Sequence, residues 1–211
     1  MKGLIEHRLE GLANLDRKRT AVLAVHWQVD AIKPEGILGP TFAAMVDATG
    51  VVGRTGRVIA AARRAGMPVI YVNVCYWPGH TDLVRNNALF NAVAGMNGFV
   101  RGTKGVEVVP ELAPQPGDYI VEHSRISSFY GTDLVSILTA RGISTLIVTG
   151  IATNVAVDHT IRDAVQIGYN VILPEDCCCS SSPAHHEAAL LTLRVLATEV
   201  TDTETLLSVI G

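Results

Sequence analysis

Three short polar segments follow apolar runs typical of buried strands, and they hold the side chains best suited to chemistry. The segments are His26-Trp27-Gln28, His123-Ser124-Arg125 and Gly150-Ile151-Ala152-Thr153-Asn154. In an open parallel sheet, ligands bind at the carboxyl ends of the strands. Histidine titrates nearest to neutral pH, so His26 and His123 are candidates for an acid and a base. The third segment leads into a predicted helix, whose first N–H groups suit an anion or a developing oxyanion.

The elements that must position these segments alternate along the chain. Apolar runs predict strands at Thr20–Trp27, Pro68–Tyr76, Asp118–Glu122, Thr145–Thr149, Tyr169–Leu173 and Thr198–Val200. Helical periodicity predicts helices at Val51–Ala65, Asp133–Ala140, Asn154–Ile167, Pro183–Val195 and Glu204–Ile210. Strands that alternate with helices and are apolar throughout indicate a parallel sheet covered on both faces. We therefore expect an α/β fold, a three-layer α/β/α Rossmann-like domain with a six-stranded parallel sheet, and a single domain over residues 1–211.

Two stretches between these elements carry no clear periodicity. The first contains Pro34, Gly36, Gly39 and Pro40, a composition typical of a loop. The second extends from residue 80 to 116 and is expected to contain short helical pieces at best. A loop of that length inside a compact domain is usually functional, so we expect it to border the site.

Composition excludes several classes of partner. The formal net charge is −3 and no basic stripe is present, so nucleic acid is not an expected partner. No apolar run is long enough to span a membrane, and Met1–Arg19 lacks the apolar core of a signal peptide. We expect a cytoplasmic protein whose four cysteines, Cys75 and the run Cys177, Cys178 and Cys179, are reduced. Packing is the simpler interpretation of that run, and the sequence leaves its role open.

The same segments resemble a known family. The stretches AVLAVHWQVD, VEHSRISSFYGTDL and GIATNVAVDHTIRDAVQIGYNVILPEDCC are similar, in order and spacing, to three motifs of the isochorismatase-like (cysteine hydrolase) superfamily. The resemblance covers residues 18–200, and the last motif is the most diagnostic. It implies a single isochorismatase-like hydrolase domain, a small-molecule substrate and a homo-oligomer, either a dimer or a tetramer.

The resemblance also assigns roles to positions at which this chain differs. The family's Asp corresponds to His26, its Lys to His123 and its nucleophilic Cys to Ala156. The family's oxyanion hole comes from the backbone at the positions of Ala152 and Ala156, which does not depend on side-chain type. A cis peptide bond at Ile151–Ala152 is a further expectation from the family. We predict a hydrolase of a small amide, urea or vinyl ether, with His26 and His123 as acid and base and no cofactor.

Alternative interpretations remain open at this level. A decayed site would leave a catalytically silent binding or scaffold protein. The two histidines could instead hold a divalent ion, with His159, Glu122 or water completing its ligands, or perform lyase or isomerase chemistry. The region Cys75–His80 lacks the Asp of the metal element in nicotinamidase-like relatives, so we expect no metal. The predicted substrate-binding residues, placed around the cavity by the resemblance and by their loops, are Trp27, Gln28, Trp77, Tyr130, Arg85 and His159.

Overall fold

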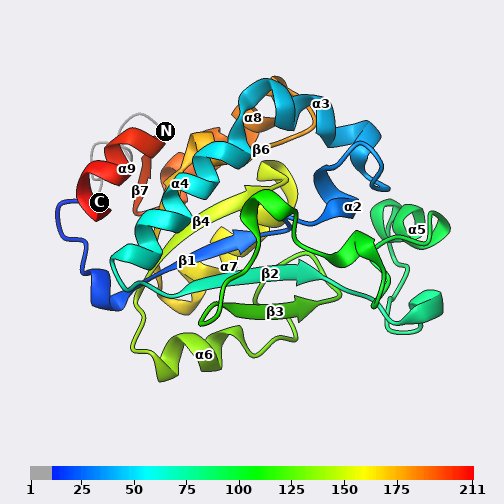
Figure 1. The fold of residues 1–211 in the computed structure, drawn as a ribbon, viewed down its shortest axis with the longest axis horizontal. Helices are drawn as coiled ribbons and strands as arrows, with labels where there is room; N and C mark the ends of the chain where they lie inside the picture. Colours follow the sequence, from blue (N-terminus) through cyan, green and yellow to red (C-terminus); the bar gives the residue numbers. More distant parts are fainter. Residues whose placement is uncertain (1–10) are drawn as a thin grey trace.

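A parallel sheet forms the middle of the molecule (Figure 1). The computed structural model describes residues 11–211; residues 1–10, part of the expected domain and of the Met1–Arg19 stretch, lie outside the described residues. The strands are β1 (Thr20–Val25), β2 (Val69–Val74), β3 (Tyr119–His123), β4 (Thr145–Ile151), β5 (Asn170–Pro174), β6 (Cys178–Cys179) and β7 (Glu199–Thr201). Six of them follow the order β3-β2-β1-β4-β5-β7, and β6 pairs with the end of β4. The predicted six strands are therefore confirmed, and the two-residue β6 is an addition too short for a sequence pattern to indicate.

Helices cover both faces of the sheet. They are α2 (Val29–Ile32), α3 (Gly39–Thr49), α4 (Val51–Arg64), α5 (Ala88–Gly95), α6 (Leu134–Ala140), α7 (Asp158–Ile167), α8 (Pro183–Leu196) and α9 (Thr203–Ile210). Apolar side chains of α3, α4 and α9 pack in one core cluster. Those of α6, α7 and α8 pack in a second cluster on the other face, which gives the three predicted layers. Within residues 11–211, no helix is both long enough and apolar enough to cross a membrane.

The central strand β1 explains why the site forms where it does. All six of its residues are buried, and their side chains alternate between the two core clusters, with Val22 in one and Leu23 in the other. β1 pairs in parallel with β2 and with β4, so the carboxyl ends of these strands lie at one edge of the sheet. The residues that follow β1 and β4 are therefore neighbours in space although they are far apart in the sequence.

The predicted loop around Pro34 to Pro40 is partly wrong. Gly39 and Pro40 are the first two residues of α3, because proline is tolerated in the first turn, where its missing N–H has no helical partner. The 80–116 stretch contains short helical pieces, as the sequence predicts, and α5 is the longest of them. Its N-terminus is capped by the Asn87 side chain, which accepts a hydrogen bond of 2.9 Å from the Phe90 N–H.

Candidate active site

The structure brings His26 and His123 together at the carboxyl edge of the sheet. His26 directly follows β1, His123 ends β3, and β2 lies between these two strands. The Nε2 atoms of the two imidazoles are 2.7 Å apart, and the ring centroids are 4.9 Å apart. The backbone of His26 has a φ of 59°, in the left-handed region that residues other than glycine rarely adopt. Such a local cost is typical of functional sites.

The hydrogen bonds around the two histidines indicate which imidazole donates to the other. His123 Nδ1–H donates to the backbone carbonyl of Ser127 at 3.1 Å, so His123 Nε2 carries the lone pair. His26 Nε2–H therefore donates to His123 Nε2 when both rings are neutral. In this arrangement His26 Nδ1 is the ring nitrogen that does not face His123.

Burial keeps both imidazoles neutral. The pKa of His26 is lowered well below its ordinary value, first by loss of solvent and then by the charge of His123, while the Ile151 backbone opposes both effects. Burial also lowers the pKa of His123 to about 4, against a smaller opposing effect of the Ser127 carbonyl. At neutral pH both rings are therefore unprotonated.

The loop after β3 holds the carbonyl that orients His123. The Ser127 hydroxyl donates to Asp163 Oδ2 of α7 at 2.5 Å. The next hydroxyl, on Ser128, lies 2.8 Å from Thr160 Oγ1, also on α7. These contacts fasten the loop to a helix and fix the Ser127 carbonyl beneath His123. The sequence analysis did not select Asp163, because nothing in the local pattern pairs a helix carboxylate with a distant loop.

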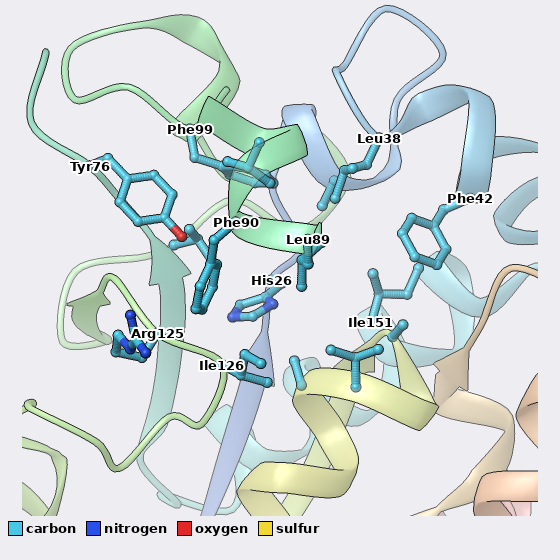
Figure 2. A pocket seen from close by; sticks show the side chains of 16 residues that line it. His26, Leu38, Phe42, Tyr76, Leu89, Phe90, Phe99, Arg125, Ile126 and Ile151 are labelled. Carbon is cyan, nitrogen blue, oxygen red and sulfur yellow. The ribbon is translucent and has the colours of Figure 1, made fainter. Parts of the chain in front are cut away.

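A small apolar cavity opens beside His26 (Figure 2). Its volume is about 90 Å³, and its lining includes Phe42 from α3 and Phe90 from α5. His26 lines the cavity whereas His123 does not, so His123 lies behind its partner. The side chains with polar groups in the lining are His26, Tyr76 and Arg125, and Arg125 is a residue that the sequence analysis did not select.

The turn between β4 and α7 forms another wall of the cavity. Ala152 and Ala156 both line it, as expected for the positions assigned to the oxyanion hole. The expected cis peptide bond at Ile151–Ala152 is present. The predicted helix from Asn154 begins instead as a π-helical turn, Thr153–Val157, in which the Ala152 carbonyl accepts from Val157 N–H at 3.2 Å. The Thr153 hydroxyl contacts His186 Nδ1 of α8 at 2.8 Å, so α8 supports this turn.

Gly150 determines how closely this turn approaches β1, and we predict a large effect for Gly150→Ala. A Cβ atom at Gly150 would lie 2.4 Å from the Val25 carbonyl oxygen. The backbone φ of 150° is also one that residues with a side chain rarely adopt. Because the obstacle is backbone, β4 must move away from β1 next to His26. We expect a loss of about 2 kcal/mol or more in the free energy of unfolding, measured by urea denaturation.

The matched control for this prediction is Gly53→Ala. Gly53 lies inside α4, and a Cβ atom there would meet nothing within 4 Å. Alanine has the higher helix propensity, so this variant should gain roughly 0.5–1 kcal/mol. Equal stability of the two variants would contradict the close-approach argument.

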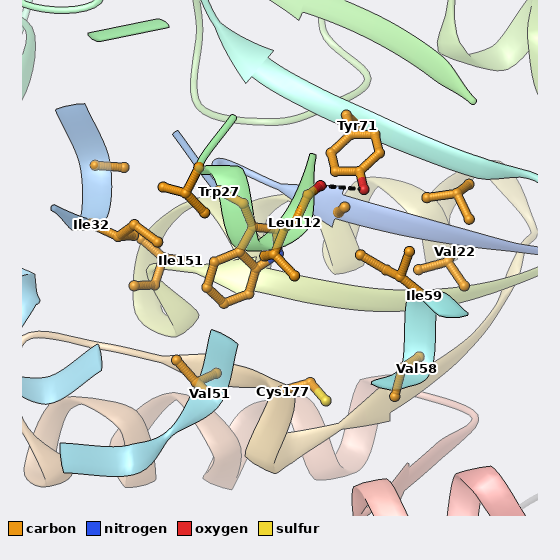
Figure 3. Packing of buried hydrophobic residues seen from close by; sticks show 14 of the residues in the cluster. Val22, Trp27, Ile32, Val51, Val58, Ile59, Tyr71, Leu112, Ile151 and Cys177 are labelled. Carbon is orange, nitrogen blue, oxygen red and sulfur yellow. Dashed lines mark hydrogen bonds between the residues drawn. The ribbon is translucent and has the colours of Figure 1, made fainter. Parts of the chain in front are cut away.

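Three predicted substrate-binding residues lie away from the cavity, which corrects their expected position at its mouth. Trp27 is fully buried in the core, and its indole N–H donates to Thr149 Oγ1 at 3.3 Å (Figure 3). Trp77 and Tyr130 are 54% and 68% exposed, and neither lines the cavity. Trp27 is buried because the left-handed backbone at His26 interrupts the alternation of side chains along the strand. The side chain that follows His26 is therefore directed into the core.

The other three predicted binding residues also lie outside the cavity lining. Gln28 is fully buried, and its amide exchanges hydrogen bonds with the Val74 backbone, which makes it structural. Arg85 is exposed. His159 is exposed on α7, and its Nδ1 bonds to the Val155 carbonyl at 2.8 Å.

The residues considered for a metal site have other partners. Glu122 forms an ion pair of 2.6 Å with Arg101, and His159 points to its own helix. Among residues 11–211, no group of three or more His, Cys, Asp or Glu side chains is arranged to hold a metal ion.

All four cysteines are buried and free, and burial raises the pKa of Cys177 to about 11. These thiols are therefore poor nucleophiles at neutral pH.

Comparisons with known proteins agree with this fold. The family description "Isochorismatase domain" matches residues 20–205. A ureidoacrylate amidohydrolase RutB of Variovorax paradoxus is 39% identical over 141 residues, which cover 61% of this chain and 56% of that protein. A protein of the same name from Methylobacterium radiotolerans is 33% identical over 210 residues, 93% of this chain and 81% of that protein. The crystal structure of a cysteine hydrolase from Pseudomonas syringae pv. phaseolicola has a TM-score of 0.83 at 32% identity and covers 93% of this chain and 94% of that one. The chain therefore belongs to the isochorismatase family of hydrolases.

Proposed function

We propose that this protein hydrolyses an amide-type bond of a small molecule with His26 as general base and water as the nucleophile. The observation that carries the proposal is the buried His26–His123 hydrogen bond of 2.7 Å at the wall of an apolar cavity. A neutral imidazole in that position carries a lone pair that can take a proton from water in the transition state, and its lowered pKa makes it a weaker base than a solvated imidazole. His123 acts as the positioning residue, since it contacts His26 and not the cavity.

The proposed reaction proceeds without a covalent intermediate because Ala156 carries no nucleophile. The unprotonated ring nitrogen of His26 takes a proton from water as the water oxygen attacks the substrate carbonyl. The carbonyl oxygen becomes an oxyanion beside the backbone of Ala152 and Ala156, where N–H donors would stabilise its charge. The imidazolium then gives its proton to the leaving nitrogen, and the C–N bond breaks. The Ile151 backbone, which raises the pKa of His26, favours the imidazolium during this exchange.

Relatives support the choice of bond. Two of them carry the name ureidoacrylate amidohydrolase, in which the bond broken is of the amide type. The cavity is small and mostly apolar, which suits a substrate with a short carbon body. We therefore place ureido and amide compounds before esters and vinyl ethers as substrates.

The test is a panel of small ureido compounds, amides, esters and vinyl ethers, each assayed in water enriched in ¹⁸O. We expect turnover of an amide-type member, with one ¹⁸O atom in the product acid and no mass adduct on the protein after rapid quenching. An acyl-protein adduct would contradict the water mechanism. Absence of turnover across the panel would favour the alternative, a silent binding member of the family.

A further inference from the structure

Arg125 is a positive charge in a cavity that offers it no counter-ion. It lines the apolar cavity from the loop after β3, and its guanidinium carbon lies 4.6 Å from the centre of the Phe90 ring. Its one hydrogen bond to a described residue is a long one, 3.4 Å, to the Val84 carbonyl. No carboxylate of residues 11–211 forms an ion pair with it, whereas Arg54, Arg63 and Arg101 each have one.

An aromatic hydroxyl lies on the same side of the cavity. Figure 2 shows the Tyr76 ring next to Phe90, with its oxygen directed toward Phe90. Tyr76 is buried, and its hydroxyl forms no hydrogen bond with another residue in the described part of the chain. Its pKa is raised to about 12, mainly by burial, so the group is a donor at neutral pH. The negative charge of Asp82 adds to the rise in the pKa of Tyr76, and the positive charge of Arg125 opposes it by a smaller amount.

These side chains supply the hydrogen-bond donors and the positive charge that an anionic group of a ligand would need. A guanidinium presents parallel N–H donors that match the two oxygens of a carboxylate, and such charge-assisted bonds are about twice as strong as neutral ones. The Phe90 ring holds the guanidinium plane from one side and leaves its edge available. His26 lies across Phe90 in the same cavity, so an anchored anion would leave the rest of a short ligand beside the imidazole (Figure 2).

We infer that Arg125 and Tyr76 form a subsite for the carboxylate of a small, flat monoanion, and that Arg125 determines specificity for that charge. The inference rests on the proposed function, because it assigns the part of the substrate that does not react. The preferred substrate is then a short acid whose far end carries the amide-type group. The mostly apolar lining of the cavity suits a short carbon body between the two ends.

Crotonate and crotonamide are suitable probes because they share a shape and differ in charge. We expect NMR titration at pH 7 to give crotonate at least about tenfold tighter binding than crotonamide. Arg125→Gln should remove this preference, and Arg125→Lys should keep part of it, since a lysine retains the charge without the paired donors. Arg85→Gln is the matched control: this exposed arginine lies outside the cavity lining and should leave the preference unchanged.

The outcomes separate this inference from the proposed function. Equal binding of the two probes by the unaltered protein would overturn the anion subsite, even if amide hydrolysis is observed. A preference that survives in Arg125→Gln would also overturn it. His26→Ala should retain the preference for crotonate while it loses hydrolysis. A preference for crotonate in a protein that turns over no amide would support the subsite and contradict the proposed function alone.

Discussion

His26→Ala is expected to lower kcat for the amide-type substrate by about a thousandfold, with little change in KM. General-base catalysis by a positioned side chain contributes roughly 10²–10⁴-fold, and removal of the base affects the step in which the proton moves. The loss should fall on kcat because the apolar walls that bind the substrate remain. Steady-state kinetics on the best substrate of the panel provide the measurement.

The control is His159→Ala, which removes an exposed imidazole that lies outside the cavity lining and should leave kcat unchanged. Added imidazole should restore part of the activity of His26→Ala, because the truncated side chain enlarges the cavity by about one ring. An unchanged kcat in His26→Ala would remove His26 from the mechanism.

His123→Asn tests the division of roles within the pair. Asparagine can still donate to the Ser127 carbonyl but cannot reach His26 as the imidazole does. We expect a smaller loss of kcat than in His26→Ala, since the base is present but no longer oriented. A larger loss in His123→Asn would indicate that His123 itself is the base.

The strands and the histidine pair could be predicted because both depend on short-range patterns. A buried parallel strand such as β1 is apolar at all but its first position, and its carboxyl end is where ligands bind. His26 follows such a strand and His123 ends the edge strand β3, so the parallel topology brings them to one edge of the sheet. Their 2.7 Å contact needed, in addition, the left-handed backbone at His26, which no residue pattern indicates.

The rest of the site depends on contacts between distant segments. Phe42, Phe90 and Arg125 come from α3, α5 and the loop after β3, and they meet only because the 80–116 stretch folds over the edge of the sheet. Trp27 was predicted to line the cavity but does not. An aromatic residue beside a candidate base suggests a binding role, yet this side chain is buried in the core. Local sequence defines which residues can do chemistry, and long-range packing decides which of them line the cavity.

The histidine pair should also make the folded state sensitive to acid. His123 has a pKa of about 4 in the folded state and about 6.5 when unfolded. Between these values the unfolded chain binds a proton that the folded state excludes, so the free energy of unfolding falls as the pH falls from 6.5 to 4. The stabilisation is fully present above pH 6.5, and His123 alone should account for a loss of roughly 3 kcal/mol over that window. The lowered pKa of His26 acts in the same direction.

Urea denaturation at pH 7, 5.5 and 4.5 can isolate this effect if the protein is compared with the double variant His26→Gln, His123→Asn. Carboxylates with lowered pKa values, such as that of Glu111, are present in both proteins, so their contribution cancels in the difference. The double variant should be the less stable protein at pH 7 but should lose less stability on acidification. Parallel pH dependences would mean that the pair is already protonated in the folded state at pH 5. His26 would then be an acid rather than a base, and the proposed attack by water would lose its proton acceptor.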